Sequence, residues 1–164
     1  MAIAEEGFVK KLAAYATLAV LAHAVIVVWH LFVLTKIPPG LTPQQVLSAA
    51  IAINVAPFVG LVLLWTHYPR LASVLIFIPL AVGFSAGGFE HFLSDGPDNV
   101  FRMAATEWTL AFTISAVLLA VLELCGCWFC IRIFGKYRSG QSQIQQELDS
   151  SKGHSSSASR VHGN

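Results

Sequence analysis

The sequence has little charge, little cysteine and no excess of either charge sign. Of its 164 residues only 12% are Asp, Glu, Lys or Arg, against roughly 25% in soluble domains. A net charge of +1 excludes the basic surface by which proteins bind nucleic acid. Three cysteines are too few, and too close together, for the disulfide framework of a secreted domain. At 55% hydrophobic residues, the chain as a whole is not disordered either.

Several common catalytic motifs are also missing. The chain contains no phosphate-binding loop, no dinucleotide-binding glycine motif, no serine-hydrolase elbow and no zinc-protease HExxH. Its polar segments are too short to form a soluble catalytic domain. Any activity must therefore reside in or at a membrane, and whether the protein is an enzyme stays open.

The sequence does contain four long apolar segments, at about residues 12–34, 46–65, 71–92 and 104–134. A membrane-spanning helix needs roughly 20 mostly apolar residues, and helices satisfy the backbone groups that hydrocarbon cannot. We therefore predict an all-α integral membrane four-helix bundle made of two helical hairpins over residues 12–135. An N-terminal segment, 1–11, precedes it, and a polar tail, 136–164, is expected to be disordered.

Turn residues separate the four segments. Prolines interrupt the chain between Lys36 and Pro43, and Thr42 is placed to cap the next helix. Two further turns are predicted at 67–70 and 94–99. The first segment resembles a signal peptide, because the basic pair Lys10-Lys11 precedes the apolar run and Ala22-His23-Ala24 has the small residues of a cleavage site. Its apolar run continues to Leu34, however, which favours a retained helix.

Basic residues predict the orientation of a multi-pass membrane protein. Six of them fall on one side of the predicted spans and two on the other, Lys36 and Arg102. The six are Lys10, Lys11, Arg70, Arg132, Lys136 and Arg138. We therefore predict that both termini lie in the cytoplasm. Tryptophans near the span ends, Trp29 and Trp108 outside and Trp65 and Trp128 inside, match the aromatic belts of membrane proteins.

Ionisable residues inside the spans are the strongest candidates for function, because they are costly in a membrane. Depth counting at about 1.5 Å per residue brings four of them to nearly one level in the outer leaflet: His30, Glu90, His91 and Glu107. Gly83 and Gly87 form a small-residue pair on the face of Glu90, which suits close helix contact. We expect the four ionisable side chains to converge, with His23 and Asn54 deeper, as a second shell or pathway.

This predicted cluster has three possible roles. Imidazole and carboxylate groups suit a transition metal, and two histidines on different helices could hold a haem. The Glu-x-x-His spacing of di-iron bundles is absent, since Glu90 and His91 are adjacent. The same groups could instead hold helices together by polar contacts, or carry protons, ions or a small molecule.

Cys125, Cys127 and Cys130 form a second candidate group near the cytoplasmic end of the fourth span. They could act as a redox pair, bind a soft metal, carry a lipid, or simply pack as small apolar residues. Glu123 lies just above them, and we expect it to pair with a partner or with another subunit. The run from Asp95 to Asn99 is predicted to be an ordinary turn rather than a calcium site.

The sequence favours an accessory or structural subunit of a membrane complex, with a polar His/Glu cluster in the outer leaflet. A metal- or haem-dependent redox protein is the first alternative, and a small ion, proton or small-molecule transporter is the second. The expected partners are the lipid bilayer and other membrane subunits or further copies of the chain, and no nucleic acid is expected.

Overall fold

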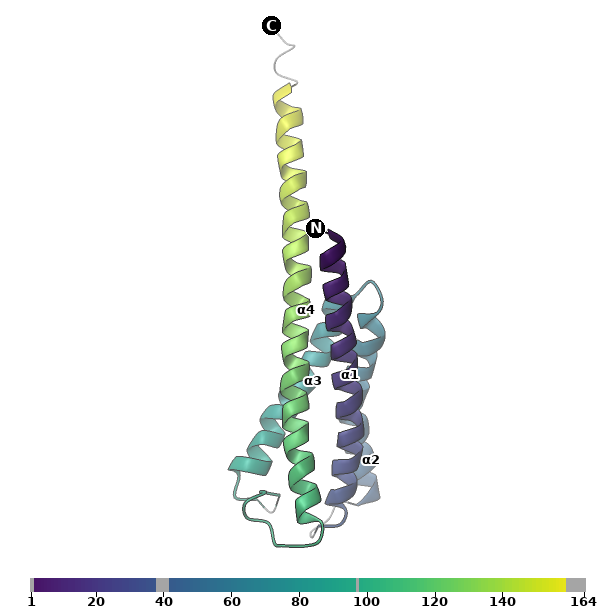
Figure 1. The fold of residues 1–164 in the computed structure, drawn as a ribbon, viewed down its shortest axis with the longest axis vertical. Helices are drawn as coiled ribbons and strands as arrows, with labels where there is room; N and C mark the ends of the chain where they lie inside the picture. Colours follow the sequence, from purple (N-terminus) through teal and green to yellow (C-terminus); the bar gives the residue numbers. More distant parts are fainter. Residues whose placement is uncertain (1, 38–41, 97, 159–164) are drawn as a thin grey trace.

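The computed structural model describes residues 2–37, 42–96 and 98–158. In this part of the chain the polypeptide forms long α-helices, and the longest connection between them, residues 94–108, leads into α4 (Figure 1). A single π-helical turn, η1, follows the third helix. The elements are α1 (Ala2–Leu34), α2 (Pro43–Leu64), α3 (Pro69–Gly88), η1 (Phe89–Leu93) and α4 (Thr109–Ala158).

The helices confirm the prediction of an all-α four-helix bundle with candidate membrane spans. The stretches long and apolar enough to cross a membrane are Lys10–Leu34, Pro43–Leu64, Pro69–Leu93 and Thr109–Tyr137. Their outward faces are apolar: Val25 is 68% exposed, Val62 69% and Leu110 70%. Such faces suit lipid, whose tails are as apolar as leucine. The chain is thus consistent with a multi-pass membrane protein.

Local sequence signals explain where the helices begin. Thr42 caps α2 as predicted: its hydroxyl accepts from the Gln45 amide, and the Gln45 side chain accepts from the Thr42 amide. Both α2 and α3 start at a proline, Pro43 and Pro69, which suits the first helical turn. The last helix begins at Thr109, later than the sequence predicts, because residues 104–108 form an irregular connection held by the Thr106 and Thr109 hydroxyls.

Helix extends close to both ends of the chain. The first helix begins at Ala2, and α4 continues to Ala158. Residues 141–149 include four Gln, one Glu and one Leu, which favour a helix. Figure 1 shows α1 beginning and α4 ending beyond the same end of the bundle. Residues 159–164 lie outside the described part.

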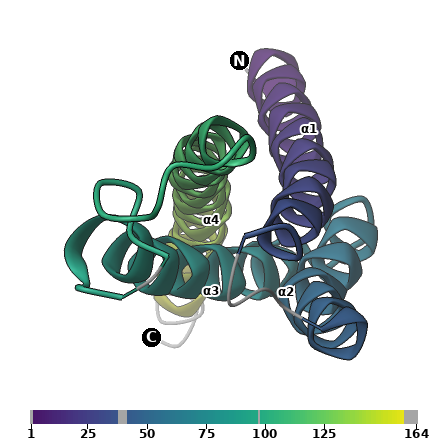
Figure 2. The ribbon, with the colours of Figure 1, turned by 90° about the horizontal axis from the view of Figure 1, so that it is seen from below.

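The third helix organises the bundle by crossing the others obliquely (Figure 2). It packs against both α2 and α4, while α1 packs mainly on α4. Glycines allow these crossings: a Cβ on Gly60 would lie 2.6 Å from Ile76 Cγ1, and one on Gly126 would overlap the Leu80 side chain. Small residues of this kind let membrane helices approach closely.

Buried apolar side chains form two separate clusters. The larger one, which we call the closed-end core, lies towards the end where α1 begins, and includes Val20, Ile76, Leu80 and Ile133. The smaller one, the loop-end cluster, joins Val33, Ile37 and Phe112 at the opposite end. Most of the buried polar side chains lie between the two, so the candidate site occupies the middle of the spans.

Candidate functional site

The deepest polar contact is between His23 on α1 and Glu123 on α4. The distance from His23 Nε2 to Glu123 Oε1 is 3.2 Å, and the residues are only 1% and 7% exposed. A carboxylate oxygen can only accept, so Nε2 donates. Nδ1 of His23 is buried and has no hydrogen-bond partner. The contact therefore joins two helices in the apolar interior and leaves one ring nitrogen unsatisfied.

Gly83 on α3 makes room for this contact. A Cβ on Gly83 would lie 2.5 Å from Glu123 Oε1, so any larger residue would push the carboxyl group away. The sequence suggests that Gly83 and Gly87 serve close helix packing. In the structure Gly83 instead faces a carboxyl group, and a Cβ on Gly87 would meet only His91, at 3.8 Å.

A second buried histidine, His30, lies seven residues further along α1. Its Nδ1 is 2.8 Å from the hydroxyl oxygen of Ser115, and that hydroxyl donates its only hydrogen to the carbonyl of Phe112. The hydroxyl must therefore accept from His30, which fixes the hydrogen on Nδ1. Nε2 of His30 is buried without a partner, and carries a free lone pair in the neutral ring.

The π-turn η1 and the following loop position His91. Its Nδ1 lies 3.3 Å from the carbonyl oxygen of Asp98, which can only accept. Asn99, 4% exposed, holds this loop by donating to the Ser94 carbonyl and accepting from the Phe101 amide. Single π-turns occur often at functional sites. Here the π-turn and the loop fix the tautomer of His91 in the same way as Ser115 fixes that of His30.

The rings of His30 and His91 lie next to each other and next to Phe112. The two imidazole centroids are 5.0 Å apart, and those of His30 and His91 lie 4.9 and 5.2 Å from the Phe112 ring. Two histidines, each with its Nδ1–H held in a hydrogen bond, thus pack against the same phenylalanine ring. This arrangement orients both imidazoles and leaves the Nε2 atoms for other chemistry.

One cavity connects the two histidine sites. It has a volume of about 460 Å³ and is lined by residues of α1, α2, α3, η1 and α4. Its polar side chains are His30, His91 and Glu123, and the rest of the lining is apolar. Most small-molecule sites in proteins are concave and apolar with a few polar groups placed inside. The cavity can hold several waters, given that each occupies about 30 Å³ in the liquid.

The structure brings together only the two histidines of the predicted four-residue cluster. Glu90 is exposed and its carboxylate is near the Ser94 hydroxyl, at 3.4 Å. Glu107 is exposed and accepts from the indole of Trp108 at 3.1 Å. Among the described residues, no group of three or more His, Cys, Asp or Glu side chains is arranged to hold a metal ion.

The other candidate residues lie outside this cavity. Asn54 donates to the Ala50 carbonyl of its own helix at 2.8 Å. The cysteines have no disulfide: Cys125 is exposed, Cys130 is buried, and the Cys127 thiol lies 3.9 Å from the Phe77 carbonyl. Cys130 belongs to the closed-end core, which agrees with the packing role among those considered for it.

Sequence reasoning missed two partners, Glu123 for His23 and Ser115 for His30. Depth counting from the predicted spans does not find the first, because from a start near residue 104 Glu123 is 19 residues deep, whereas His23 is 11 residues before Leu34. With the observed start of α4 at Thr109, Glu123 is 14 residues deep, and at about 1.5 Å per residue the two depths differ by less than one helical turn. Ser115 carries no signal of its own, because serine is common in membrane helices.

Comparisons with known proteins give no relative for this chain. No protein-family model, no curated protein and no solved structure matches it.

Proposed function

We propose that this protein is an accessory membrane subunit that gives protons access from one membrane surface to the middle of the bilayer. The observation that carries the proposal is the single cavity shared by His91, His30 and Glu123. Chains of Asp, Glu and His inside membranes are typical of proton relays. The His23–Glu123 pair would be the terminal proton site.

The tautomers support a relay function. In His30 the hydrogen on Nδ1 is bound by Ser115, so Nε2 is the atom that can take up a proton. In His91 the Asp98 carbonyl binds the hydrogen on Nδ1 in the same way. Water in the cavity would pass protons between these Nε2 atoms and the Glu123 carboxylate. Each histidine would then receive and release protons at one defined atom.

The closed-end core supports a role as a subunit rather than a complete transporter. Its apolar side chains fill the bundle beyond Glu123, so the proposed pathway extends through only part of the membrane. A proton held at Glu123 would need a second chain to continue. We propose that this chain is another membrane subunit or a second copy of the protein.

We further propose that both termini lie in the cytoplasm and that the cavity leads towards the outer surface. Support comes from the six basic residues on one side of the spans against two on the other. Labelling of a single introduced cysteine, in cells or in right-side-out vesicles, tests this orientation.

Infrared spectroscopy of the reconstituted protein tests the relay. After a pH jump, we expect a carboxyl band that is absent in Glu123→Gln and unchanged in the control Glu107→Gln. We expect His30→Phe to delay this band by about tenfold or more, equivalent to a barrier higher by about 1.4 kcal/mol. His67→Phe, in an exposed turn, serves as control. Equal rates in wild type and His30→Phe would contradict the proposal.

A metal- or haem-dependent redox protein is the second candidate function. The observation in its favour is that His30 and His91 both have a bound Nδ1, the arrangement usual for histidines that ligate through Nε2. The two imidazoles would have to suffice as protein ligands. An optical spectrum with elemental analysis of purified protein tests this, since bound haem or stoichiometric metal lost in His91→Ala would favour it.

A further inference from the structure

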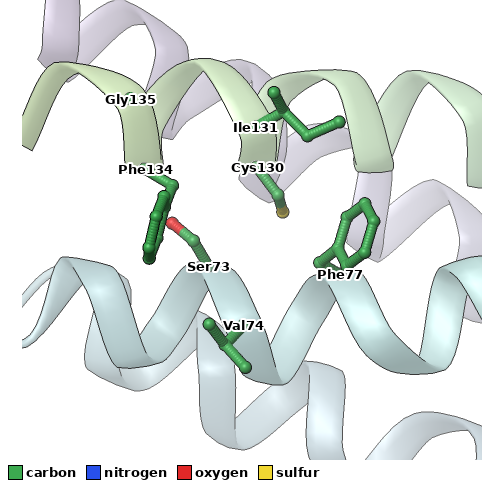
Figure 3. A pocket seen from close by; sticks show the side chains of 7 residues that line it. All are labelled: Ser73, Val74, Phe77, Cys130, Ile131, Phe134 and Gly135. Atoms are coloured by element: carbon green, nitrogen blue, oxygen red, sulfur yellow. The ribbon is translucent and has the colours of Figure 1, made fainter. Parts of the chain in front are cut away.

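Two further cavities lie along the contact between α3 and α4, at the end of the bundle opposite η1. The first, which we call the polar cavity, has a volume of about 450 Å³ and is lined by Thr66, His67, Tyr68, Pro69, Arg70, Leu71 and Tyr137. The second, the apolar groove, has a volume of about 360 Å³ and is lined by Ser73, Val74, Phe77, Cys130, Ile131, Phe134 and Gly135 (Figure 3).

The two spaces follow each other along the same two helices. On α3 the lining passes from Arg70 and Leu71 to Ser73, and ends at Phe77. On α4 it passes from Tyr137 back to Cys130. The seven helical steps from Arg70 to Phe77 span about 10 Å. Together the two spaces therefore run from the end of the spans into the region of the hydrocarbon.

The groove is apolar despite containing a serine and a cysteine. Figure 3 shows the Ser73 hydroxyl and the Cys130 thiol pointing into the space, with the rings of Phe77 and Phe134 at its two ends. The Ser73 hydroxyl donates to the Pro69 carbonyl at 2.8 Å, so its hydrogen is already bound. Val74 and Ile131 are exposed at the rim, on the lipid-facing side of a spanning bundle. The groove thus suits a hydrocarbon chain.

The polar cavity has positive charge at its entrance. Nη2 of Arg70 donates to the Tyr137 carbonyl at 2.6 Å, which fixes the guanidinium between α3 and α4. His67 is exposed beside it, and Lys136 precedes Tyr137 on α4. The described residues that line this cavity include no Asp or Glu. Arginine is well suited to bind phosphate oxygens, because its guanidinium is planar and permanently charged.

We propose that the polar cavity and the apolar groove together bind one anionic phospholipid. Its phosphate would lie against Arg70 and His67, and one acyl chain would follow the groove past Cys130. A lipid fits better than a free anion because the polar cavity opens directly onto an apolar groove at the depth of a lipid tail. The proposal shares no residue with the proton relay, so the two can fail separately.

Native mass spectrometry of the full-length protein, purified in detergent, tests this proposal. Equal amounts of phosphatidylglycerol and phosphatidylcholine are added, and the bound fraction of each is measured. We expect one phosphatidylglycerol to be retained with a preference of about fivefold or more, the factor equivalent to ~1 kcal/mol per basic residue near a membrane surface. Equal retention of both lipids by the wild type would overturn the proposal without any variant.

Two variants separate the head and tail contributions. Arg70→Gln should abolish the preference for phosphatidylglycerol, while Arg102→Gln, a charge change at the η1 end, should leave it unchanged. Val74→Trp should fill the groove from its rim and reduce retention of both lipids, whereas Val62→Trp on the exposed face of α2 should not. If Arg70→Gln and Arg102→Gln behave alike, or Val74→Trp retains lipid normally, the proposal is wrong.

A competition experiment distinguishes a lipid from a free anion. We expect inorganic phosphate, added in large excess over lipid, to leave phosphatidylglycerol bound, because the acyl chain contributes most of the contact area. Displacement of the lipid by phosphate would assign the polar cavity to a soluble anion and overturn the lipid assignment. Circular dichroism of each variant confirms that the helices are intact before its result is used.

Discussion

The two ends of the bundle are built from the same four helices, but they bury different kinds of side chain. At the closed end, Gly60 and Gly126 let α3 approach its neighbours, and apolar side chains fill the space around Ile76 and Leu80, with the polar cavity and the apolar groove confined to the α3–α4 edge. Towards η1 the buried residues of α2 stop at Pro57, and its first half is largely exposed. The cavity with its histidines lies where this packing is lost. Polar groups thus occupy the region in which the oblique course of α3 keeps the helices from closing.

This contrast separates the residues that stabilise the fold from those that determine the chemistry of the site. In the closed-end core the buried side chains are surrounded by others, so a deletion there leaves a void with no compensation. At the cavity end space is already present, so a deletion there mainly removes a directed hydrogen bond. Variants in the closed-end core should therefore mainly lower the free energy of unfolding, whereas variants at the cavity should mainly change the hydrogen bonds of the site.

The largest effect is expected from Leu80→Ala in the closed-end core. Leu80 is 1% exposed and lies against Gly126, so the variant should lose about 2–5 kcal/mol of unfolding free energy. The tautomers of His30 and His91 should not change. Unfolding in mixed micelles measures the loss, and Leu110→Ala on an exposed face is the control, expected to cost less than about 0.5 kcal/mol. Similar losses of unfolding free energy in both variants would show that Leu80 does not lie in a tightly packed core.

An intermediate effect is expected from Asn99→Ala in the loop after η1. The variant removes two hydrogen bonds of a buried side chain, to Ser94 and Phe101, at a cost of about 1–3 kcal/mol. Because the loop lies outside the closed-end core, hydrogen exchange should accelerate in residues 94–103 and stay unchanged in the middle of α4. Asp95→Asn, which removes only the exposed ion pair with Arg102, should cost less than about 1 kcal/mol. Faster hydrogen exchange throughout α4 would show that the local stabilities of the two ends are not independent.

The smallest effect on stability is expected from Ser115→Ala. Removing the hydroxyl that accepts from His30 should cost about 0.6 kcal/mol, the average for such bonds between membrane helices. The larger change should be in the histidine: nitrogen NMR should show His30 losing its single Nδ1–H tautomer. Thr113→Ala, whose hydroxyl bonds within its own helix, is the matched control. An unchanged tautomer in Ser115→Ala would show that Ser115 does not orient the ring.

The sequence was sufficient to predict four apolar helices in a bundle, but only part of the site. Apolar length alone located the spans, because a helix is the economical way to satisfy a backbone in hydrocarbon. Depth counting placed His30 and His91 at one level, and their rings lie 5.0 Å apart. It could not place Glu107, since α4 begins only at Thr109 and leaves Glu107 in the preceding connection.

Rotation about the helix axis is the harder quantity to predict. Glu90 lies on the small-residue face of a regular helix continued from Gly83, yet it is exposed at the start of η1, where α3 ends. The same limit applies to Glu123, for which the sequence predicts pairing with a partner or another subunit, and which faces His23 across the bundle. The depth of a residue in the membrane follows from counting residues, whereas the direction of its side chain around the helix axis depends on where the helical winding changes.

The π-turn itself has a consequence for how this chain tolerates insertions and deletions. A turn of π-helix holds about one residue more than a turn of α-helix, so η1 behaves as a one-residue phase shift at the end of α3. Deleting a single residue between Phe89 and Leu93 would let the α-helical winding continue without a break. The loop that follows would keep nearly the same angle about the helix axis, whereas the same deletion inside α3 would rotate η1 and the loop by about 100° relative to the rest of α3. The extra residue of η1 therefore makes this turn a place where the chain length can change with little loss of angular register between the third span and the loop after it.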